Sequence, residues 1–137
     1  MSQRVLIMCD DPLFRAAVKA TLSRAGFEAV GPDGFEAAWA LFTARQFDLL
    51  FCDLGEDETA RLARLSAPEA RECWGCLLVS TDSSGRLAAL ESIRREGGEV
   101  LAKPLRHGDL LEAASRLVLR RLEAGPGGAA GPMGQGA

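Results

Sequence analysis

The sequence has no tyrosine, one histidine and two lysines, and it lacks any apolar run long enough to cross a membrane. The apolar run near its start is also too short for a signal-peptide core, and it stops at two acidic residues. No stretch is rich in Lys and Arg, and the net charge of −3 provides no basic surface for nucleic acid. We therefore expect a cytoplasmic protein that neither enters a membrane nor binds nucleic acid directly.

The four cysteines give no sign of a disulfide framework, because no secretion signal accompanies them. Cys73 and Cys76, in the segment CWGC, have the spacing of a thioredoxin-like redox pair. That motif requires a strand-to-helix context that activates the first thiol, whereas this pair precedes an expected strand. We expect all four thiols to be structural, with Cys9 and Cys52 as small buried apolar side chains.

The composition that remains is that of one globular domain. The 137 residues are 47% apolar and 26% charged, and a chain of this length can bury a single core. From residue 124 the sequence reads AGPGGAAGPMGQGA, with no charge and almost no large apolar side chain. We expect a folded domain over 1–123 and, over 124–137, a mobile tail or a linker to a further segment.

Short apolar runs alternate with segments of helical periodicity along the chain. The runs predicted to be strands are Val5–Cys9, Phe27–Val30, Asp48–Cys52, Cys76–Ser80 and Glu99–Ala102. Apolar residues at three- and four-residue spacing predict helices around 14–22, 35–45, 58–65, 84–95 and 110–122. Because the runs are continuously apolar, both faces of each strand are expected to be covered. The expected fold class is therefore α/β, with a doubly wound parallel sheet.

Polar residues follow these strands at the ends where open parallel sheets bind ligands. In chain order they are Asp10, Asp11, Asp53, Ser80, Thr81 and Lys103. Each has a simpler explanation when taken alone: the first two acids, for example, could cap a helix that starts at Pro12. Their joint occurrence at strand ends favours one shared pocket.

Three carboxylates in one pocket would repel one another by about 4 kcal/mol per pair at a protein-surface dielectric, so they need a compensating cation. Oxygen ligands that leave room for water and phosphate favour Mg²⁺. We therefore predict that Asp10 and Asp11 hold a metal ion against Asp53. Lys103 supports this prediction, because a compact ammonium suits a phosphoryl oxygen and most other basic residues of the chain are arginines.

From about Arg4 to Leu122 the sequence resembles the CheY-like receiver domains of two-component response regulators. The resemblance rests on CDD at 9–11, CDL at 52–54, LLVST at 77–81 and AKP at 102–104. It implies a flavodoxin-like fold of five βα units, whose five-stranded parallel sheet has the order 2-1-3-4-5. It also implies that Asp53 accepts a phosphoryl group from a histidine kinase or a histidine phosphotransfer protein.

The resemblance assigns roles to the remaining strand-end residues. Asp10, Asp11 and Asp53, with the backbone carbonyl of Gly55, would coordinate Mg²⁺. Lys103 would pair with the carboxylate or the phosphoryl group, across a cis peptide bond to Pro104.

A hydroxyl group at the end of the fourth strand would sense the phosphoryl group. Ser80 would donate its hydroxyl to a phosphoryl oxygen and move the following loop, and Thr81 is the alternative for this role.

The implied output is protein contact, since such a domain catalyses only its own phosphorylation and dephosphorylation. The readout face would lie on the fourth helix, fifth strand and fifth helix, and would involve Leu87, Leu90, Val100 and Leu110. The oligomeric state is left open, with a phosphorylation-dependent dimer as one option.

The sequence departs from the family pattern at two places. Glu56 and Asp57 replace the apolar residue and the proline that usually follow the phosphoacceptor, and Val100 replaces the aromatic switch residue. These departures leave an alternative, a pseudo-receiver that works as an interaction module without phosphorylation. A thiol redox protein acting through Cys73 and Cys76 is a further alternative.

Overall fold

The computed structural model of the chain describes residues 3–43, 46–55, 57–82 and 88–124. One parallel sheet has the strand order β2-β1-β3-β4-β5. Its strands are β1 (Arg4–Met8), β2 (Glu28–Val30), β3 (Leu49–Asp53), β4 (Leu77–Thr81) and β5 (Glu99–Ala102). The α/β class, the parallel sheet and its order are thereby confirmed, and each strand agrees with its predicted range to within one residue at either end.

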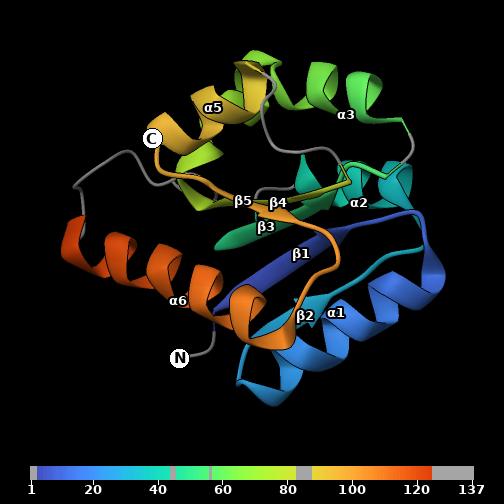
Figure 1. Cartoon of the computed structure of the whole chain (residues 1–137), viewed down its shortest axis with the longest axis vertical. Coiled ribbons are helices and arrows are strands. Elements are labelled where there is room, and N and C mark those ends of the chain that lie inside the picture. The colour runs from blue at the N-terminus through green and yellow to red at the C-terminus, as the bar shows by residue number, and fades with distance from the viewer. Residues whose placement is uncertain (1–2, 44–45, 56, 83–87, 125–137) are drawn as a thin grey trace.

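Helices cover both faces of this sheet (Figure 1). They are α1 (Pro12–Arg24), α2 (Phe35–Phe42), α3 (Glu58–Leu65), α4 (Pro68–Arg71), α5 (Ala88–Arg95) and α6 (His107–Ala124), with a 3-10 turn η1 at Trp74–Cys76. α1 and α6 lie on one face, and α2, α3 and α5 lie on the other (Figure 1). Within the described residues, no helix is both long enough and apolar enough to span a membrane.

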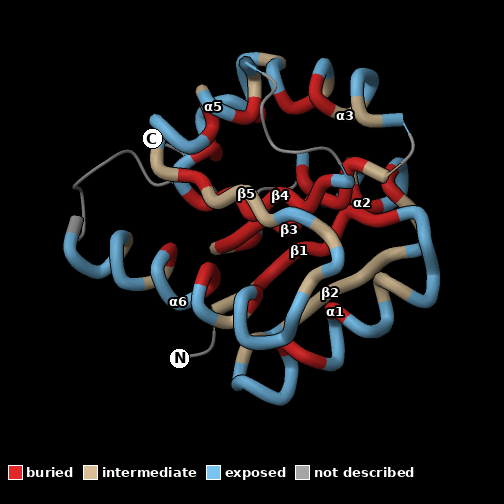
Figure 2. The backbone as a smooth tube through the Cα atoms, in the orientation of Figure 1, coloured by how far each residue is buried: buried red, intermediate tan, exposed pale blue. Residues whose placement is uncertain are grey.

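The middle of the sheet forms the core of the molecule (Figure 2). β3 and β4 are buried at every position, and β1 is buried from Val5 to Met8. Branched and aromatic side chains on these strands pack under helices on both sides, which is why their sequences are continuously apolar. On β3 and β4 the only polar residues are those at the carboxyl ends, Asp53, Ser80 and Thr81. They place polar groups at one edge of an otherwise apolar core.

Helix α1 begins where the sequence places a capping residue directly before a proline. Asp11 is the N-cap, and its Oδ1 accepts the backbone N–H groups of Leu13 at 2.9 Å and Phe14 at 3.2 Å. Pro12 occupies the first turn, where its missing N–H has no cost. The simpler explanation offered for the acidic pair therefore applies to Asp11.

Two short elements were not predicted, namely α4 and η1, which connect α3 to β4. Their few residues carry too little periodicity to separate them from a loop. The predicted second helix reaches Phe42 in the structure, and positions 44–45 lie outside the described residues. The predicted fourth helix corresponds to α5, since positions 83–87 also lie outside the described residues. Apart from Ala124, which ends α6, the predicted tail is likewise not described.

Gly98, just before β5, provides a sensitive test of this packing. A Cβ atom added there would lie 2.5 Å from Cγ2 of Ile93 and 2.7 Å from the backbone oxygen of Trp74. We expect Gly98→Ala to lower the free energy of unfolding by about 2–3 kcal/mol, because a fixed carbonyl cannot move aside. Urea denaturation measures the change.

Gly108→Ala is the matched control, because a Cβ atom at Gly108 would meet no other atom within 4 Å. Alanine is favoured over glycine inside a helix, so this variant should be as stable as the wild type or more so. Equal stability of the two variants would contradict the close packing around Gly98.

Candidate functional site

Asp53 and Ser80 are brought together by strand pairing at the carboxyl end of the sheet. The register of β3 and β4 sets the two residues directly opposite each other. The Ser80 hydroxyl donates a hydrogen bond to Asp53 Oδ1 at 2.9 Å, and both side chains are buried. A buried carboxylate requires such donors and a countercharge. The ends of β3 and β4 thus place these two side chains in direct contact.

Lys103 supplies that countercharge from the residue that follows β5. Its Nζ lies 2.7 Å from Asp53 Oδ1 and 4.5 Å from the centre of the Phe14 ring. Burial by itself would lower the pKa of Lys103, but the hydrogen bond and the charge of Asp53, together with the charge of Asp82, raise it overall. Lys103 is therefore a firmly protonated cation. The Lys103–Pro104 peptide bond is cis, as predicted.

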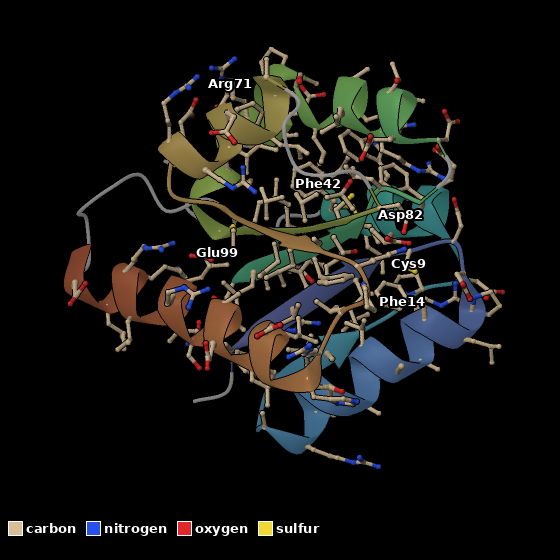
Figure 3. The ribbon with its side chains drawn as sticks, in the orientation of Figure 1. Cys9, Phe14, Phe42, Arg71, Asp82 and Glu99 are labelled. Atoms are coloured by element: carbon tan, nitrogen blue, oxygen red, sulfur yellow. The ribbon has the colours of Figure 1, made fainter. Side chains whose placement is uncertain are left out.

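Cys9 is a member of this cluster that sequence reasoning missed. Its Sγ lies 3.7 Å from Asp53 Oδ2 and 3.4 Å from the backbone oxygen of Asp11. Burial, followed by the charge of Asp53, raises the pKa of the Cys9 thiol to about 12, so the S–H remains available as a donor. Figure 3 shows Cys9 at the same edge of the sheet as Phe14. The sequence could have indicated this role through the position of Cys9, which directly follows β1 and precedes the acidic pair.

Asp10 turns towards helices α2 and α3. Its Oδ1 accepts the backbone N–H of Phe35 at 2.9 Å, and its Oδ2 forms an ion pair with Arg61. A Cβ atom on Gly34 would lie 3.2 Å from the same Oδ1, so the chain passes close to the carboxylate here. Asp10 thus anchors the first turn of α2.

Of the other predicted site residues, Gly55 lies beside Asp53, whereas the Thr81 side chain contacts a different residue. Gly55 has a left-handed backbone, with φ of 60°, and a Cβ atom there would lie 3.7 Å from Asp53 Oδ2. The Thr81 hydroxyl is bonded to the carboxylate of Glu58. Since Ser80 contacts Asp53 and Thr81 is engaged elsewhere, the geometry favours Ser80 as the residue that would sense a change at Asp53.

The acids as arranged do not fit a divalent metal ion. Both oxygens of Asp10 have partners from α2 and α3, Asp11 caps α1, and Asp53 contacts Lys103 and Ser80 through one oxygen. Among the described residues, no group of three or more His, Cys, Asp and Glu side chains is placed to hold a metal. The ligand set predicted for Mg²⁺ is therefore not assembled in this arrangement.

The residues named for the readout face need correction. Leu90 on α5 and Leu110 on α6 are 0% and 2% exposed, so they belong to the core and cannot contact a partner. Val100 is partly buried and Leu87 lies outside the described residues. Periodicity identified the apolar stripes of these helices, but such a stripe faces the sheet rather than solvent.

The CWGC cysteines are packed inside the molecule. Cys73 and Cys76 are both 0% exposed, and the Cys76 Sγ lies 3.1 Å from the backbone oxygen of Cys73. Hydrogen bonding with Cys73 and burial raise the pKa of the Cys76 thiol well above its usual value. A buried, protonated thiol is a poor nucleophile, so the geometry gives no support to a redox function.

Known proteins resemble this chain in their three-dimensional structure. No protein-family model matches the chain, and no curated protein sequence matches it. The structure of CheY4, a chemotaxis response regulator of Vibrio cholerae, aligns with a TM-score of 0.66 and 20% identity, over 85% of this chain and 99% of that one. A CheY-like receiver domain protein from Methanospirillum hungatei aligns with a TM-score of 0.66 and 19% identity, over 90% of this chain and 99% of that one.

A response regulator from Thermotoga maritima is also similar, with a TM-score of 0.63 and 20% identity, over 87% of this chain and 99% of that one. In all three cases nearly the whole of the other protein is matched. The chain therefore has the fold of the CheY-like receiver domains of response regulators, with Asp53, Ser80 and Lys103 in contact at the carboxyl end of its sheet.

Proposed function

We propose that this chain, which has the fold of response regulator receivers, is a receiver domain that accepts a phosphoryl group on Asp53 and signals by protein contact. The observation that carries the proposal is the contact of one carboxylate oxygen with two side chains, one from β4 and one from the residue that follows β5. Asp53 Oδ1 lies 2.7 Å from Lys103 Nζ and accepts the Ser80 hydroxyl at 2.9 Å. A carboxylate held by a cation and a hydroxyl is suited to receive an anionic group, because both partners can follow the new charge.

The transfer step converts the carboxylate into an acyl phosphate. A carboxylate oxygen of Asp53 attacks the phosphorus of a phosphohistidine or an acyl phosphate donor and forms a new P–O bond. The bond from phosphorus to the donor nitrogen or oxygen breaks, and its electron pair leaves with the donor. Lys103 balances the negative charge that remains on the product, and the Ser80 hydroxyl can turn from the carboxylate to a phosphoryl oxygen.

The Mg²⁺ ion expected from the resemblance has no part in this step as we propose it. The residues that would hold it are engaged with Arg61, with the start of α2 and with the start of α1. Lys103 is the positive group in contact with the acceptor. We expect transfer to be slow for this reason, since a metal ion normally supplies much of the charge stabilisation in phosphoryl transfer.

The proposed partners follow from the same chemistry. The donor would be a histidine kinase or a histidine phosphotransfer protein of the cytoplasm. The receiver of the signal would be a protein that binds the outer surface formed by α5, β5 and α6. Asp53 is linked to this surface through Lys103, whose backbone N–H donates to the Thr81 oxygen of β4 at 2.9 Å.

The proposal is tested by incubating the full chain with acetyl phosphate or phosphoramidate and measuring its intact mass. The expected result is the gain of one phosphoryl group, lost again on treatment with hydroxylamine, which cleaves acyl phosphates. Parallel samples with Mg²⁺ and with a chelator measure how far the reaction depends on a metal ion. If neither donor adds a phosphoryl group under any of these conditions, the phosphoacceptor function is wrong.

That negative result would support a second candidate function, a pseudo-receiver that binds partners without being phosphorylated. Two observations favour it. Cys9 offers a thiol, rather than a metal-binding carboxylate, to Asp53 Oδ2, and Arg61 neutralises Asp10. Both features stabilise the unmodified state of the pocket.

A further inference from the structure

Two arginines of α3 lie over the aromatic face of α2. The guanidinium of Arg61 lies 4.0 Å from the centre of the Phe35 ring, and that of Arg64 lies 4.4 Å from the centre of the Trp39 ring. Phe35 and Trp39 themselves are stacked, with ring centres 6.0 Å apart. The two arginines thus share one helix and one type of aromatic contact, but they differ in the carboxylate that each one binds.

Arg64 pairs with Glu36 on the surface of α2, at 2.8 Å, whereas Arg61 pairs with Asp10 at the end of β1. The Arg61 side chain is 16% exposed, and that of Asp10 is 59% exposed. Arg61 is therefore the more buried partner of this ion pair. The same guanidinium thus contacts both the Phe35 ring and the Asp10 carboxylate.

The two carboxylates at neighbouring strand ends thus have separate cations supplied by the protein. Lys103 contacts Asp53, and Arg61 contacts Asp10. A divalent ion could use Asp10 only after displacing Arg61 from its carboxylate, which would leave a largely buried guanidinium without an anion. Leaving a buried charge unpaired is costly, and the cation–π contact with Phe35 adds to the cost of moving this side chain.

We propose that Arg61 is the built-in counter-cation of Asp10 and excludes divalent metal ions from the strand-end pocket. The inference concerns the unmodified chain and holds whether or not Asp53 accepts a phosphoryl group. According to this proposal, the unmodified protein holds no Mg²⁺ at this site. The reason is the Arg61 side chain and not a lack of acidic ligands, since Asp10 and Asp53 are both present.

The experiment is a titration of the full chain with MgCl₂, followed by calorimetry and by the midpoint of thermal unfolding, at constant ionic strength. The wild type and Arg64→Gln are expected to show no saturable heat and no shift of the midpoint. Arg61→Gln is expected to bind Mg²⁺ saturably and to gain roughly 4 °C in midpoint when the ion is present at ten times its Kd. Arg64→Gln is the matched control, because it removes a guanidinium from the same helix and aromatic face without touching Asp10.

The double variant Arg61→Gln/Asp10→Asn assigns the new binding to the released carboxylate and should again bind no Mg²⁺. Arg61→Met keeps an unbranched side chain against Phe35 and should behave like Arg61→Gln. Saturable Mg²⁺ binding by the wild type, with an affinity equal to that of Arg61→Gln, would overturn the proposal, and this measurement needs no variant to fold. Absence of binding in both well-folded Arg61 variants would overturn it equally. Acetyl phosphate plays no part in the titration, so these results are separate from those that decide the phosphoacceptor function.

Discussion

Replacing Asp53 by asparagine is expected to abolish the uptake of a phosphoryl group from acetyl phosphate. The amide oxygen carries no full negative charge, so it cannot replace the carboxylate as a nucleophile. Asparagine has almost the same shape and can still accept the Ser80 hydroxyl, which Asp53 accepts at 2.9 Å. Intact-mass measurement should therefore find unmodified protein, while circular dichroism should find an unchanged fold.

Asp82→Asn provides the control for this variant. Asp82 is exposed, follows β4 directly and adds to the raised pKa of Lys103, so its loss alters the electrostatics of the pocket without removing the nucleophile. It should retain phosphoryl uptake, at a changed rate. Uptake by Asp53→Asn at the level of the wild type would show that a different residue is modified, and peptide mapping would then locate it.

The sequence was sufficient to predict the parallel sheet whose strand ends carry Asp53, Ser80 and Lys103. Continuous apolar runs marked the buried strands, and the carboxyl ends of parallel strands necessarily lie at one edge of a sheet. Asp53 and Ser80 therefore had to be neighbours once β3 and β4 paired, and they occupy opposite positions in the register. Lys103 follows from the same rule, because β5 lies next to β4.

The partners of the acids at the end of β1 could not be predicted in this way. A local rule, the preference of aspartate for a helix N-cap, decides the position of Asp11. The orientation of the Asp10 side chain depends instead on its ion pair with Arg61, which lies 51 positions further along the chain. Charge repulsion correctly indicated that the acids need a cation. The sequence could not reveal that the cation is a guanidinium presented by α3, because that depends on how α3 packs on α2.

Helix exposure was the second limit of sequence reasoning. Leu90 and Leu110 carried the expected helical periodicity, but periodicity marks the face that packs on the sheet. A readout surface consists of the residues between such positions, whose polar character makes them hard to distinguish from any solvated face. For this reason the resemblance could name the elements of the proposed readout face, but the sequence could not name its contact residues.

Lys103→Met is expected to lower the free energy of unfolding by about 3 kcal/mol and the midpoint of thermal unfolding by roughly 10 °C. The Asp53 side chain is only 4% exposed, so removing the ammonium leaves a buried carboxylate without its cation. Methionine has a similar length and can keep the contact with Phe14, whose ring centre lies 4.5 Å from the Lys103 Nζ. The loss therefore measures charge rather than shape.

Two further variants separate this effect from a general cost of substitution. Lys19→Met replaces the other lysine of the chain, which is exposed on α1, and should change stability by less than about 0.5 kcal/mol. In Asp53→Asn/Lys103→Met no charge is left unpaired at Asp53, so most of the lost stability should return. If the double variant is instead as unstable as Lys103→Met, the lysine stabilises the fold through its packing, and the pairing of Lys103 with Asp53 is not what holds the pocket together. Urea denaturation at neutral pH measures all four proteins on one scale.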